Sequence, residues 1–280
     1  MKRPILATLG LILVGAIAGT GATIAAIRAS RNPDSIFSKL RASAGAAPQD
    51  TSEANWLARH YGPTRHSMYL EEWIIRDFFK DRQQGVFVDV GAADYEAGSN
   101  TYFLETGLGW SGIAIDAQNS YRAGYLAHRP RTTFFSSFVS DHSHDKATLF
   151  LAAGALASSS TRDFSANYGG VKGSIEVPTI TLNDLLASQG MMSFDFLSMD
   201  IELAEPLALA GLDLQRFHPA LVTVEAHPEV RQQLLDYFAA NHYIVVGKYL
   251  RVDPVNLWFM PLGATVAPFP PEHKPDEWQH

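Results

Sequence analysis

The sequence predicts an α/β fold built on a doubly wound, mostly parallel sheet. Short β-branched runs, such as residues 86–90 and 111–116, have the pattern of buried strands. Segments with helical character, for example residues 118–128, follow most of these runs. Strands that alternate with helices favour a parallel sheet with a helix layer on each face. With 280 residues, the chain is long enough for one such domain and short appendages.

The expected elements follow one another in a regular order. A helix is expected over residues 67–80, where apolar side chains recur at helical spacing, and Gly85 interrupts the pattern before the first strand. Pro206 is tolerated in the first turn of a helix, which fits a helix that begins at this residue. The expected strands cover residues 86–90, 111–116, 132–136, 146–152, 174–180, 194–199, 221–225, 243–248 and 256–260. The expected helices cover residues 67–80, 100–106, 118–128, 182–188, 206–210 and 229–240.

The composition excludes several kinds of site. Apolar residues make up 46% of the chain and charged residues 18%, as in ordinary globular proteins. Cysteine is absent, which excludes disulfides, cysteine-based metal sites and a thiol nucleophile. Of the 22 Lys and Arg, six lie in residues 1–50, with two of the 29 Asp and Glu, so the rest of the chain has a net charge of −11. A domain this acidic would repel a phosphate backbone, so no nucleic-acid partner is expected.

The N-terminal residues 1–28 are expected to form a transmembrane anchor. Residues 4–27 contain no charged side chain, and a helix of about 20 apolar residues can cross a bilayer core. A cleaved signal peptide is the alternative, with Lys2 and Arg3 as its basic end and Ala-Ser-Ala at residues 42–44 as a distant cleavage site. The apolar run is longer than that of a usual signal peptide, which favours the retained anchor.

The charges around the apolar run indicate an orientation. Four basic residues lie within residues 28–41, against two before the run, so the folded domain is expected in the cytoplasm. Residues 29–53, rich in Ser, Ala, Pro and Asp, are expected to be a linker. The folded domain is expected over residues 54–265, and residues 266–280 are expected to be a C-terminal tail.

Polar residues and glycine follow the first two expected strands. In doubly wound sheets, ligands bind at the carboxyl ends of the strands. Asp89 lies at the end of the first strand, and the small residues Gly91 and Ala92 would let a ligand approach the backbone closely. Alone, this sequence would also fit an ordinary tight turn. However, Asp116 ends the next strand 25 residues after Gly91, where a carboxylate can accept hydrogen bonds from a ribose diol. Together these features predict a nucleoside-type ligand.

Acidic residues and a histidine follow two later strands. Asp200, Glu202 and Glu205 follow one strand, and Glu225 and His227 lie at the end of the next. Clustered carboxylates can act as a base, as hydrogen-bond acceptors or as metal ligands, and histidine is the usual proton acceptor near neutral pH. Glu205 is expected only to cap a helix, whereas Asp200 is expected to have a chemical function.

Three blocks of sequence resemble a known family, in the family's order. Residues 85–116 read GVFVDVGAADYEAGSNTYFLETGLGWSGIAID and look like the first-motif region of FkbM-type methyltransferases. Residues 177–186, VPTITLNDLL, are similar to the segment before that family's fourth strand. Residues 194–212, FDFLSMDIELAEPLALAGL, resemble its Asp-Phe-Leu-Lys-Ile-Asp-Val-Glu-Gly-x-Glu block. The resemblance spans about half of the chain, from residue 85 to residue 225.

The resemblance implies a class I methyltransferase fold, which is Rossmann-like with seven strands and binds S-adenosyl-L-methionine. On this basis residues 89–92 would hold the amino-acid end of the cofactor, Asp116 its ribose hydroxyls, and residues 138–141 would lie near its adenine. Asn100 is the centre of the family's Ser-Asn-Thr sequence. The cofactor-binding residues expected from the resemblance are Asp89, Gly91, Ala92, Asn100, Asp116, Ala117, Phe138 and Asp141.

The resemblance further implies O-methylation of a hydroxyl on a glycan, a lipid-linked molecule or a secondary metabolite. A hydroxyl is a weak nucleophile until a base takes its proton. Asp200 or His227 is the expected base, and Glu202 is expected to orient the acceptor. No metal site is assigned. The expected anchor favours an acceptor at the membrane.

The chain departs from the family pattern at two positions. Leu203 stands where the family block has glycine, and leucine takes a positive φ only at a cost, so the turn or the acceptor space is expected to differ. Tyr95 replaces a glycine after the first motif. These departures motivate an alternative function, a catalytically inactive methyltransferase fold that acts as a binding or scaffold protein at the membrane. An exported hydrolase is a second alternative, but neither Gly-x-Ser-x-Gly nor His-Glu-x-x-His occurs.

Overall fold

The computed structural model describes residues 52–62, 64–153, 158–168 and 170–270. It also gives the backbone of two short strands, β1 (Ile12–Leu13) and β2 (Ala26–Ile27), which pair antiparallel. The rest of the expected anchor, nearly all of the expected linker and the end of the expected tail lie outside the described residues. Within the described part, no helix is both long and apolar enough to span a bilayer.

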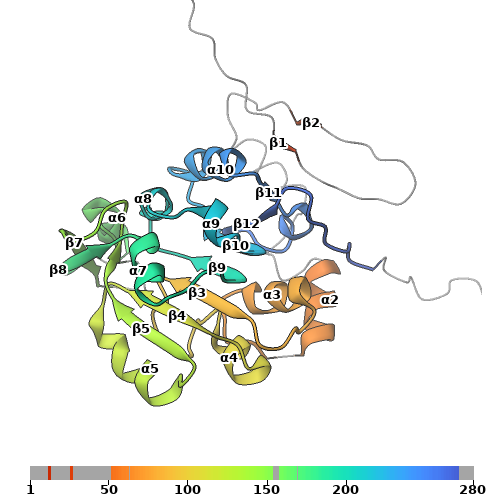
Figure 1. The fold of residues 1–280 in the computed structure, drawn as a ribbon, viewed down its shortest axis with the longest axis horizontal. Coiled ribbons are helices and arrows are strands. Elements are labelled where there is room, and N and C mark those ends of the chain that lie inside the picture. The colour runs from red at the N-terminus through yellow and green to blue at the C-terminus, as the bar shows by residue number, and fades with distance from the viewer. Residues whose placement is uncertain are drawn as a thin grey trace, which may run out of the picture.

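A seven-stranded sheet forms the centre of the domain (Figure 1). Its strands are β3 (Val86–Val90), β4 (Ser111–Asp116), β5 (Thr132–Ser136), β9 (Phe196–Met199), β10 (Leu221–Glu225), β11 (Tyr243–Val245) and β12 (Asn256–Pro261). They lie in the order β11, β12, β10, β9, β3, β4, β5. Strand β12 is antiparallel to β10 and β11, and the other paired strands are parallel. The predicted mostly parallel, seven-stranded α/β sheet is confirmed.

The chain changes direction across the sheet between β3 and β9. From β3 it proceeds outward through β4 to β5, and later it returns to β9 and proceeds outward on the other side through β10. Parallel pairing places the carboxyl ends of β3, β4, β9 and β10 at one edge of the sheet. An α/β sheet binds its ligands at such a switch point, so this topology fixes where the site lies.

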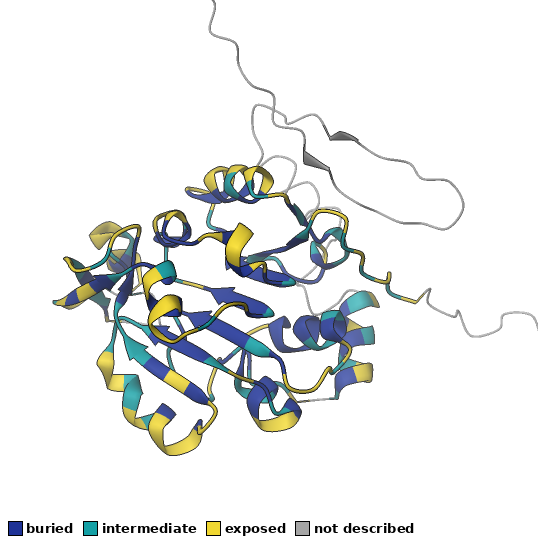
Figure 2. Ribbon diagram, in the orientation of Figure 1, coloured by how far each residue is buried: buried dark blue, intermediate teal, exposed yellow. Residues whose placement is uncertain are grey.

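Apolar side chains cover both faces of the sheet. Along β3, Val88 and Val90 belong to one core and Phe87 to another, as the two-residue period of a strand requires. The first core packs against α7 (Leu182–Ser188), α8 (Glu205–Ala210), α9 (Leu214–Phe217) and α10 (Arg231–Ala240). The second packs against α2 (Ser52–Tyr61), α3 (Glu71–Phe79) and α4 (Tyr102–Leu108), and Tyr125 of α5 (Arg122–His128) packs beside Ala114. Figure 2 shows the sheet strands largely buried between these layers.

Helix α3 is shorter than the sequence predicts. It begins at Glu71, four residues after the expected start. The Ser67 hydroxyl accepts the Glu72 N–H at 3.0 Å, and the Glu71 carboxylate accepts the Tyr69 N–H at 2.8 Å. These side chains take backbone donors that a longer helix would need, so the chain turns here instead. Helix α3 ends where Lys80 adopts a left-handed φ of 54°.

A second, three-stranded sheet stands beside α6 (Arg162–Asn167) at the end of the domain that Figure 1 shows on the left. Its strands are β6 (Phe138–Val139), β8 (Val171–Ile180) and β7 (Lys146–Ala152). The extended segments expected at 146–152 and 174–180 therefore belong to this separate sheet. The short elements α2, α6, α9 and β6 were not expected from the sequence.

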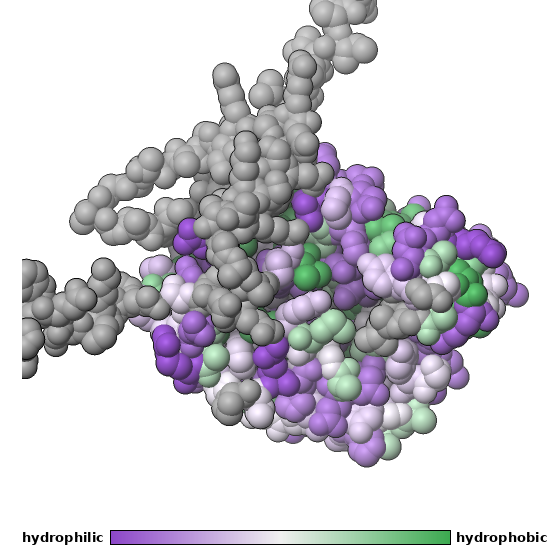
Figure 3. Space-filling model, turned by 180° about the vertical axis from the view of Figure 1, so that it is seen from behind, coloured by the Kyte–Doolittle hydropathy of each residue, from purple (hydrophilic) through white to green (hydrophobic). Residues whose placement is uncertain are grey.

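The visible outer surface of the described residues is mixed in character. Figure 3 shows mostly purple and white residues, with small separate green patches. The exposed large apolar side chains include Leu126 on α5, Met192 before β9 and Met68 before α3, which lie far apart in the sequence. A scattered pattern of this kind needs no partner to explain it.

A buried ion pair fixes the loop between β3 and α4. Arg129 and Glu105 are both buried, and Arg129 Nε lies 2.7 Å from Glu105 Oε2. The same guanidinium donates to the backbone carbonyls of Tyr95 at 2.8 Å and Thr101 at 3.1 Å. Arg129 therefore holds both the middle and the end of the loop that follows Gly91.

We expect Arg129→Met to lower the free energy of unfolding by about 3–5 kcal/mol, because Glu105 then stays buried without its partner. Urea denaturation measures this loss. The double variant Arg129→Met with Glu105→Met leaves no unpaired charge, so its loss should be smaller than the sum of the two single losses. Additive losses would contradict the proposed coupling.

Candidate active site

A cavity of about 360 Å³ opens at the carboxyl edge of the main sheet. Its wall includes residues at the ends of β3, β4, β9 and β10 and in the segments that follow them. The wall residues of interest are Asp89, Gly91, Ala92, Asn100, Asp116, Ala117, Gln118, Tyr121, Phe138, Ser198, Asp200, Glu202 and Glu225. The wall thus includes all but one of the residues expected to bind the cofactor.

Gly91 is the tightest point of the cavity wall. Its φ is +82°, and a Cβ atom here would lie 1.8 Å from the carbonyl oxygen of Asp200. Only glycine fits this position, because any side chain would collide with a neighbouring backbone that cannot move freely. The turn after β3 and the turn after β9 are therefore in direct contact.

The backbone after Gly91 is held on several sides. The N–H groups of Gly91 and Ala92 donate to the Ile115 carbonyl at 2.9 and 3.1 Å. The Tyr125 hydroxyl donates to the Ala92 carbonyl at 3.2 Å. These bonds join the turn to β4 and α5, so the cavity wall is formed before any ligand binds.

Asp116 presents a partly satisfied carboxylate to the cavity. Its two oxygens accept the Ala93 N–H at 3.0 Å and the Gln118 N–H at 2.7 Å. A carboxylate has about four acceptor positions, so two remain for the hydroxyls of a ribose. Burial raises the pKa of Asp116 to about 6 against the opposing effect of these two backbone bonds.

Asp89 and Asn100 lie deeper, between β3 and β9. The Thr101 hydroxyl donates to Asp89 Oδ2 at 2.8 Å, and Asn100 Nδ2 donates to the Ser198 hydroxyl at 3.1 Å. Burial raises the pKa of Asp89, while the hydrogen bond from Thr101 and the charge of Arg129 act in the opposite direction. The arrangement offers a carboxylate to a cationic group of a ligand, such as an ammonium.

Phe138 gives the cavity an apolar wall. It is 6% exposed and packs with Leu149, Val177 and Ala204. A planar aromatic group of a ligand could lie against this surface. Ala117, which is partly buried against the same group of side chains, extends the wall towards Asp116.

Asp141 does not line the cavity, in contrast to the prediction. Its side chain is 45% exposed and pairs with His142 Nδ1 at 2.5 Å. The chain turns away after β6, because the Ser140 N–H donates to the Ile180 carbonyl at 3.0 Å at the end of β8. The hydrophobic pattern of the sequence did not predict strand β6.

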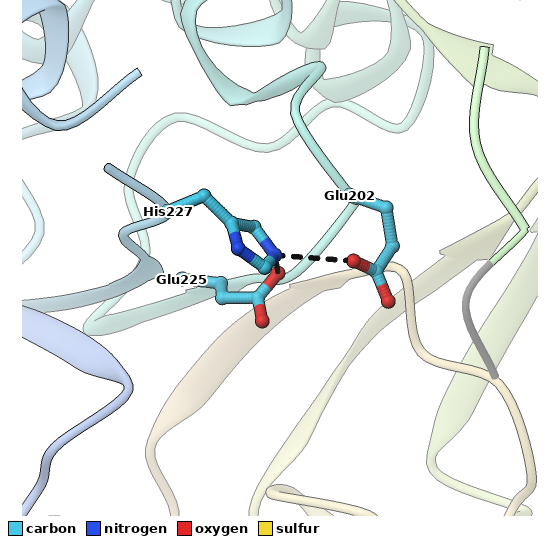
Figure 4. A group of neighbouring side chains, drawn as sticks. All are labelled: Glu202, Glu225 and His227. Atoms are coloured by element: carbon cyan, nitrogen blue, oxygen red, sulfur yellow. Dashed lines mark hydrogen bonds and ion pairs between the residues drawn. The ribbon is translucent and has the colours of Figure 1, made fainter. Parts of the chain in front are cut away.

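An acidic cluster lies on the β9 and β10 side of Gly91. Figure 4 shows His227 between two of its carboxylates, with Nε2 2.9 Å from Glu225 Oε2 and 3.3 Å from Glu202 Oε2. The bonds to these two carboxylates raise the pKa of His227 to about 10. A ring with a raised pKa gives up its proton less readily, so this arrangement favours Asp200 over His227 as the base.

Asp200 is an exposed residue that lines the cavity near the other acidic side chains. Desolvation of its carboxyl, followed by the charges of Glu225 and Glu202, raises its pKa well above the usual value. Of the two expected bases, Asp200 lines the cavity and His227 does not.

Glu205 lies at the start of α8 and is fully buried. Its Oε1 accepts the Ile201 N–H at 3.0 Å and so closes the turn before the helix, whereas Oε2 has no hydrogen-bond partner. Burial raises the pKa of Glu205 to about 7. The expected capping role is not observed, because no side chain accepts a hydrogen bond at the start of α8.

Neither departure from the family pattern fills the cavity. Leu203 adopts a φ of 80°, in the left-handed region that favours glycine. Tyr95 stacks on His128 with ring centres 4.5 Å apart, and it lies against Gly124 of α5. Neither Leu203 nor Tyr95 belongs to the cavity wall.

Several wall residues were not expected from the sequence. Ser198 lies within β9 and was not noted in the sequence, whereas Glu225, at the end of β10, was noted but given no role. Tyr69 and Asn256 come from segments far from the motifs, before α3 and at the start of β12. The position of Glu225 as the last residue of a parallel strand was the one available signal.

Comparisons with known proteins agree with this geometry. Residues 89–245 match the Methyltransferase FkbM domain, so the chain belongs to the FkbM methyltransferase family. The protein is accordingly an S-adenosyl-L-methionine-dependent methyltransferase. Among curated proteins, none matches the chain.

Two solved structures are similar in fold to this chain. One is a candidate RNA methyltransferase from Pyrococcus horikoshii, with 12% identity over 75% of this chain and 85% of that chain, and a TM-score of 0.35. The other is 1,6-didemethyltoxoflavin-N1-methyltransferase from Burkholderia thailandensis, with bound 1,6-didemethyltoxoflavin and S-adenosylhomocysteine. It has 13% identity over 92% of this chain and 96% of that chain, with a TM-score of 0.35. At this level of similarity, neither protein indicates the substrate of this chain.

The residues present fit the cofactor. The turn at Gly91 has no side chain in the way, and Asp116 has acceptor positions to spare for a diol. Phe138 offers an apolar surface for an adenine, and Asp89 a carboxylate for an ammonium group. The individual roles of these residues stay predictions, which the following substitutions test.

We expect Gly91→Ala to abolish binding of S-adenosylhomocysteine and to lower the free energy of unfolding by about 2–4 kcal/mol, through backbone strain and overpacking. Calorimetry and urea denaturation measure the two effects. Gly190→Ala is the matched control, since Gly190 has a φ of +65° with open space around it. The control should lose only about 1 kcal/mol and no affinity. Equal effects of the two substitutions would show that the contact with Asp200 is unimportant.

The affinity for S-adenosylhomocysteine should fall as the pH drops below about 6, the pKa of Asp116. Only the ionised carboxylate accepts from both ribose hydroxyls, so affinity is full above this pH and decreases by at most about tenfold per pH unit below it. The groups facing Asp116 are Asp89, Tyr121 and Tyr125, and both tyrosines stay neutral because their pKa values are raised. Calorimetry between pH 5 and 8 (about three units) measures the slope.

The variant Asp116→Asn shows whether the pH dependence comes from the titration of Asp116 or of Asp89. Its affinity should be weaker at neutral pH and should no longer depend on pH over the same range. A slope that persists in this variant would assign the titration to Asp89.

Proposed function

We propose that this methyltransferase transfers the methyl group to a hydroxyl oxygen of a glycan, lipid-linked or secondary-metabolite acceptor. The observation that carries the proposal is the contact between Gly91 and Asp200, because it places an acidic cluster next to the cofactor turn. An oxygen nucleophile needs a proton acceptor at the point of transfer. A cluster of carboxylates in the cavity wall provides this chemistry.

Different residues of the chain have different roles in the proposed transfer. When bound, S-adenosyl-L-methionine supplies a methyl group whose bond to sulfur breaks, leaving the electron pair on sulfur, as the bond to the acceptor oxygen forms. Asp200 takes the proton of the acceptor hydroxyl, and Glu202 accepts a hydrogen bond from a neighbouring group of the acceptor. His227 holds Glu202 and Glu225 in place as their counter-charge. Orientation of the two reactants supplies several kcal/mol of the rate enhancement.

The cavity mouth supports an acceptor with apolar and polar faces. Tyr69 and Tyr168 are 37% and 40% exposed and line the opening, and Met68 lies beside them at 55%. A tyrosine combines a flat apolar ring with a hydroxyl group. A sugar ring, which has C–H faces and hydroxyl edges, suits these side chains.

The N-terminal segment supports an acceptor at the membrane. Residues 4–27 contain no charge, and the basic residues that follow favour a cytoplasmic position for the domain. A membrane anchor would hold the cavity near lipid-linked acceptors and raise their effective concentration. An inactive scaffold is the alternative, and it would bind the cofactor without any methyl transfer.

We expect Asp200→Asn to lower the turnover number by about 10²–10⁴-fold, the usual contribution of a general base. The affinity for S-adenosylhomocysteine should change by less than about threefold, because the backbone of Asp200, which contacts Gly91, is kept. Transfer of a labelled methyl group to a panel of sugars and lipid-linked sugars measures turnover, and resistance of the product to alkali distinguishes an ether from an ester.

The matched control for this experiment is Asp236→Asn, an exposed residue on α10, which should keep full activity. Full activity of Asp200→Asn would exclude Asp200 as the base. Cofactor binding with no transfer to any acceptor would favour the scaffold. Transfer to nitrogen alone would exclude O-methylation.

A further inference from the structure

Three carboxylates meet at the carboxyl ends of β9 and β10. They belong to Asp200 and Glu205, which follow β9, and to Glu225, which ends β10. One oxygen of each side chain lies within 4.8 Å of one oxygen of each of the others. Asp200 and Glu225 also form part of the cavity wall.

One buried carboxylate oxygen of this group has no partner. Glu205 is fully buried and its Oε2 is unpaired, although its Oε1 is satisfied by the Ile201 N–H. Glu225 is 8% exposed, and its Oε2 lies 2.9 Å from His227 Nε2. Buried polar atoms are nearly always paired, so an unpaired carboxylate oxygen indicates a missing partner.

Four carboxyl groups gather here with one cationic partner. Those of Asp200, Glu202 and Glu225 line the cavity, and the buried Glu205 lies within 4.8 Å of Asp200 and Glu225. The cationic partner, His227, lies against Glu202 and Glu225. Burial and the neighbouring negative charges raise the pKa of Asp200 and Glu205, so both hold a proton more readily than usual. A cation between Asp200, Glu205 and Glu225 would take the place of these protons.

We propose that Asp200, Glu205 and Glu225 bind a divalent cation of the oxygen-preferring class, Mg²⁺, Mn²⁺ or Ca²⁺, at the inner end of the acceptor site. Such ions take oxygen ligands at about 2.0–2.6 Å, so opposite ligands are about 4–5 Å apart. The separations in this cluster fit that range without a rearrangement of the backbone. Two of the three ligands, Asp200 and Glu225, line the cavity, so water or an acceptor in the cavity could complete the coordination.

A second possible ligand set, Glu202, Glu225 and His227, is less suitable. Its members also lie within 4.8 Å of one another. However, the His227 Nε2 atom already contacts both carboxylates, so it has no direction left for a metal. Glu225 is common to both sets, but the fully buried, unpaired Glu205 Oε2 belongs only to the first. The observations therefore favour the first set.

The cation would make the site prefer one kind of acceptor group, and this part of the inference rests on the proposed O-methylation. An acceptor hydroxyl bound to the cation loses its proton more readily. The proton passes to the second oxygen of Asp200, while the methyl carbon leaves sulfur and bonds to the acceptor oxygen. Two adjacent hydroxyls could bind one cation together, so a vicinal diol is the favoured acceptor group.

Binding of Mn²⁺ to the full chain, freed of metal with a chelator, tests the site directly. Neither the cofactor nor an acceptor is present, so the outcome is independent of methyl transfer. Electron paramagnetic resonance counts free Mn²⁺, and we expect one bound ion per chain that added Mg²⁺ displaces. Absence of saturable Mn²⁺ binding would overturn the proposal, whether or not the chain transfers methyl groups.

Substitutions identify the ligands. Glu205→Gln should weaken Mn²⁺ binding at least tenfold, and Asp200→Asn should do the same if Glu205→Gln fails to fold. Glu202→Gln, outside the proposed set, should weaken it by less than about threefold, and Glu176→Gln on the exposed side of β8 should leave it unchanged. Loss of binding in Glu202→Gln with full binding in Glu205→Gln would overturn this ligand set.

Discussion

The contact between Gly91 and the Asp200 backbone is the constraint on which the active site depends. Strands β3 and β9 are parallel neighbours, so their chain ends leave the sheet side by side. The absence of a side chain at Gly91 lets the two turns touch. One turn belongs to the cofactor pocket and the other to the acidic cluster. A single missing Cβ therefore sets the distance between the methyl donor and the groups that would handle the acceptor.

The surrounding fold supplies the rigidity that this contact requires. Arg129 ties the loop after Gly91 to Glu105, and the N–H groups of Gly91 and Ala92 are bonded to β4. On the other side, Glu205 Oε1 closes the turn after Asp200. Each turn is thus fixed by contacts that do not use all of the acceptor positions of Asp116, so this carboxylate keeps positions for a ligand. A site on preformed turns loses little conformational entropy when a ligand binds.

Local sequence patterns predicted the sheet well, because each of its central strands is a short apolar run with a polar residue or glycine at its end. Asp116 and Gly91 could be identified for the same reason, since their positions follow directly from the strand boundaries. Asp141 could not be placed correctly, because its position depends on β6, a two-residue strand held by pairing with β8. Long-range pairing of this kind leaves no periodic signal in the sequence.

Interactions between side chains were the other feature that the sequence could not reveal. Glu225 and His227 were predicted at the end of the same strand, but the sequence did not indicate that Glu202 would contact the same ring nitrogen as Glu225. That arrangement raises the pKa of the histidine and makes it a counter-charge to the two carboxylates. The unpaired oxygen of Glu205 is likewise visible only in three dimensions, since in sequence this residue looks like an ordinary first-turn acid. No metal site was assigned from the sequence for that reason.

The turn at Glu202 and Leu203, which carries part of the acidic cluster, has a strained backbone. Both residues have left-handed φ values, 56° and 80°, which are costly for side chains with a Cβ atom. Leu203 packs against the main core, and this burial offsets part of the strain. The conformation directs Glu202 towards His227, and the Glu202 carbonyl accepts the Ser159 hydroxyl at 2.6 Å. Leucine thus holds a left-handed conformation that glycine adopts at no steric cost, and its packing against the core keeps Glu202 directed towards His227.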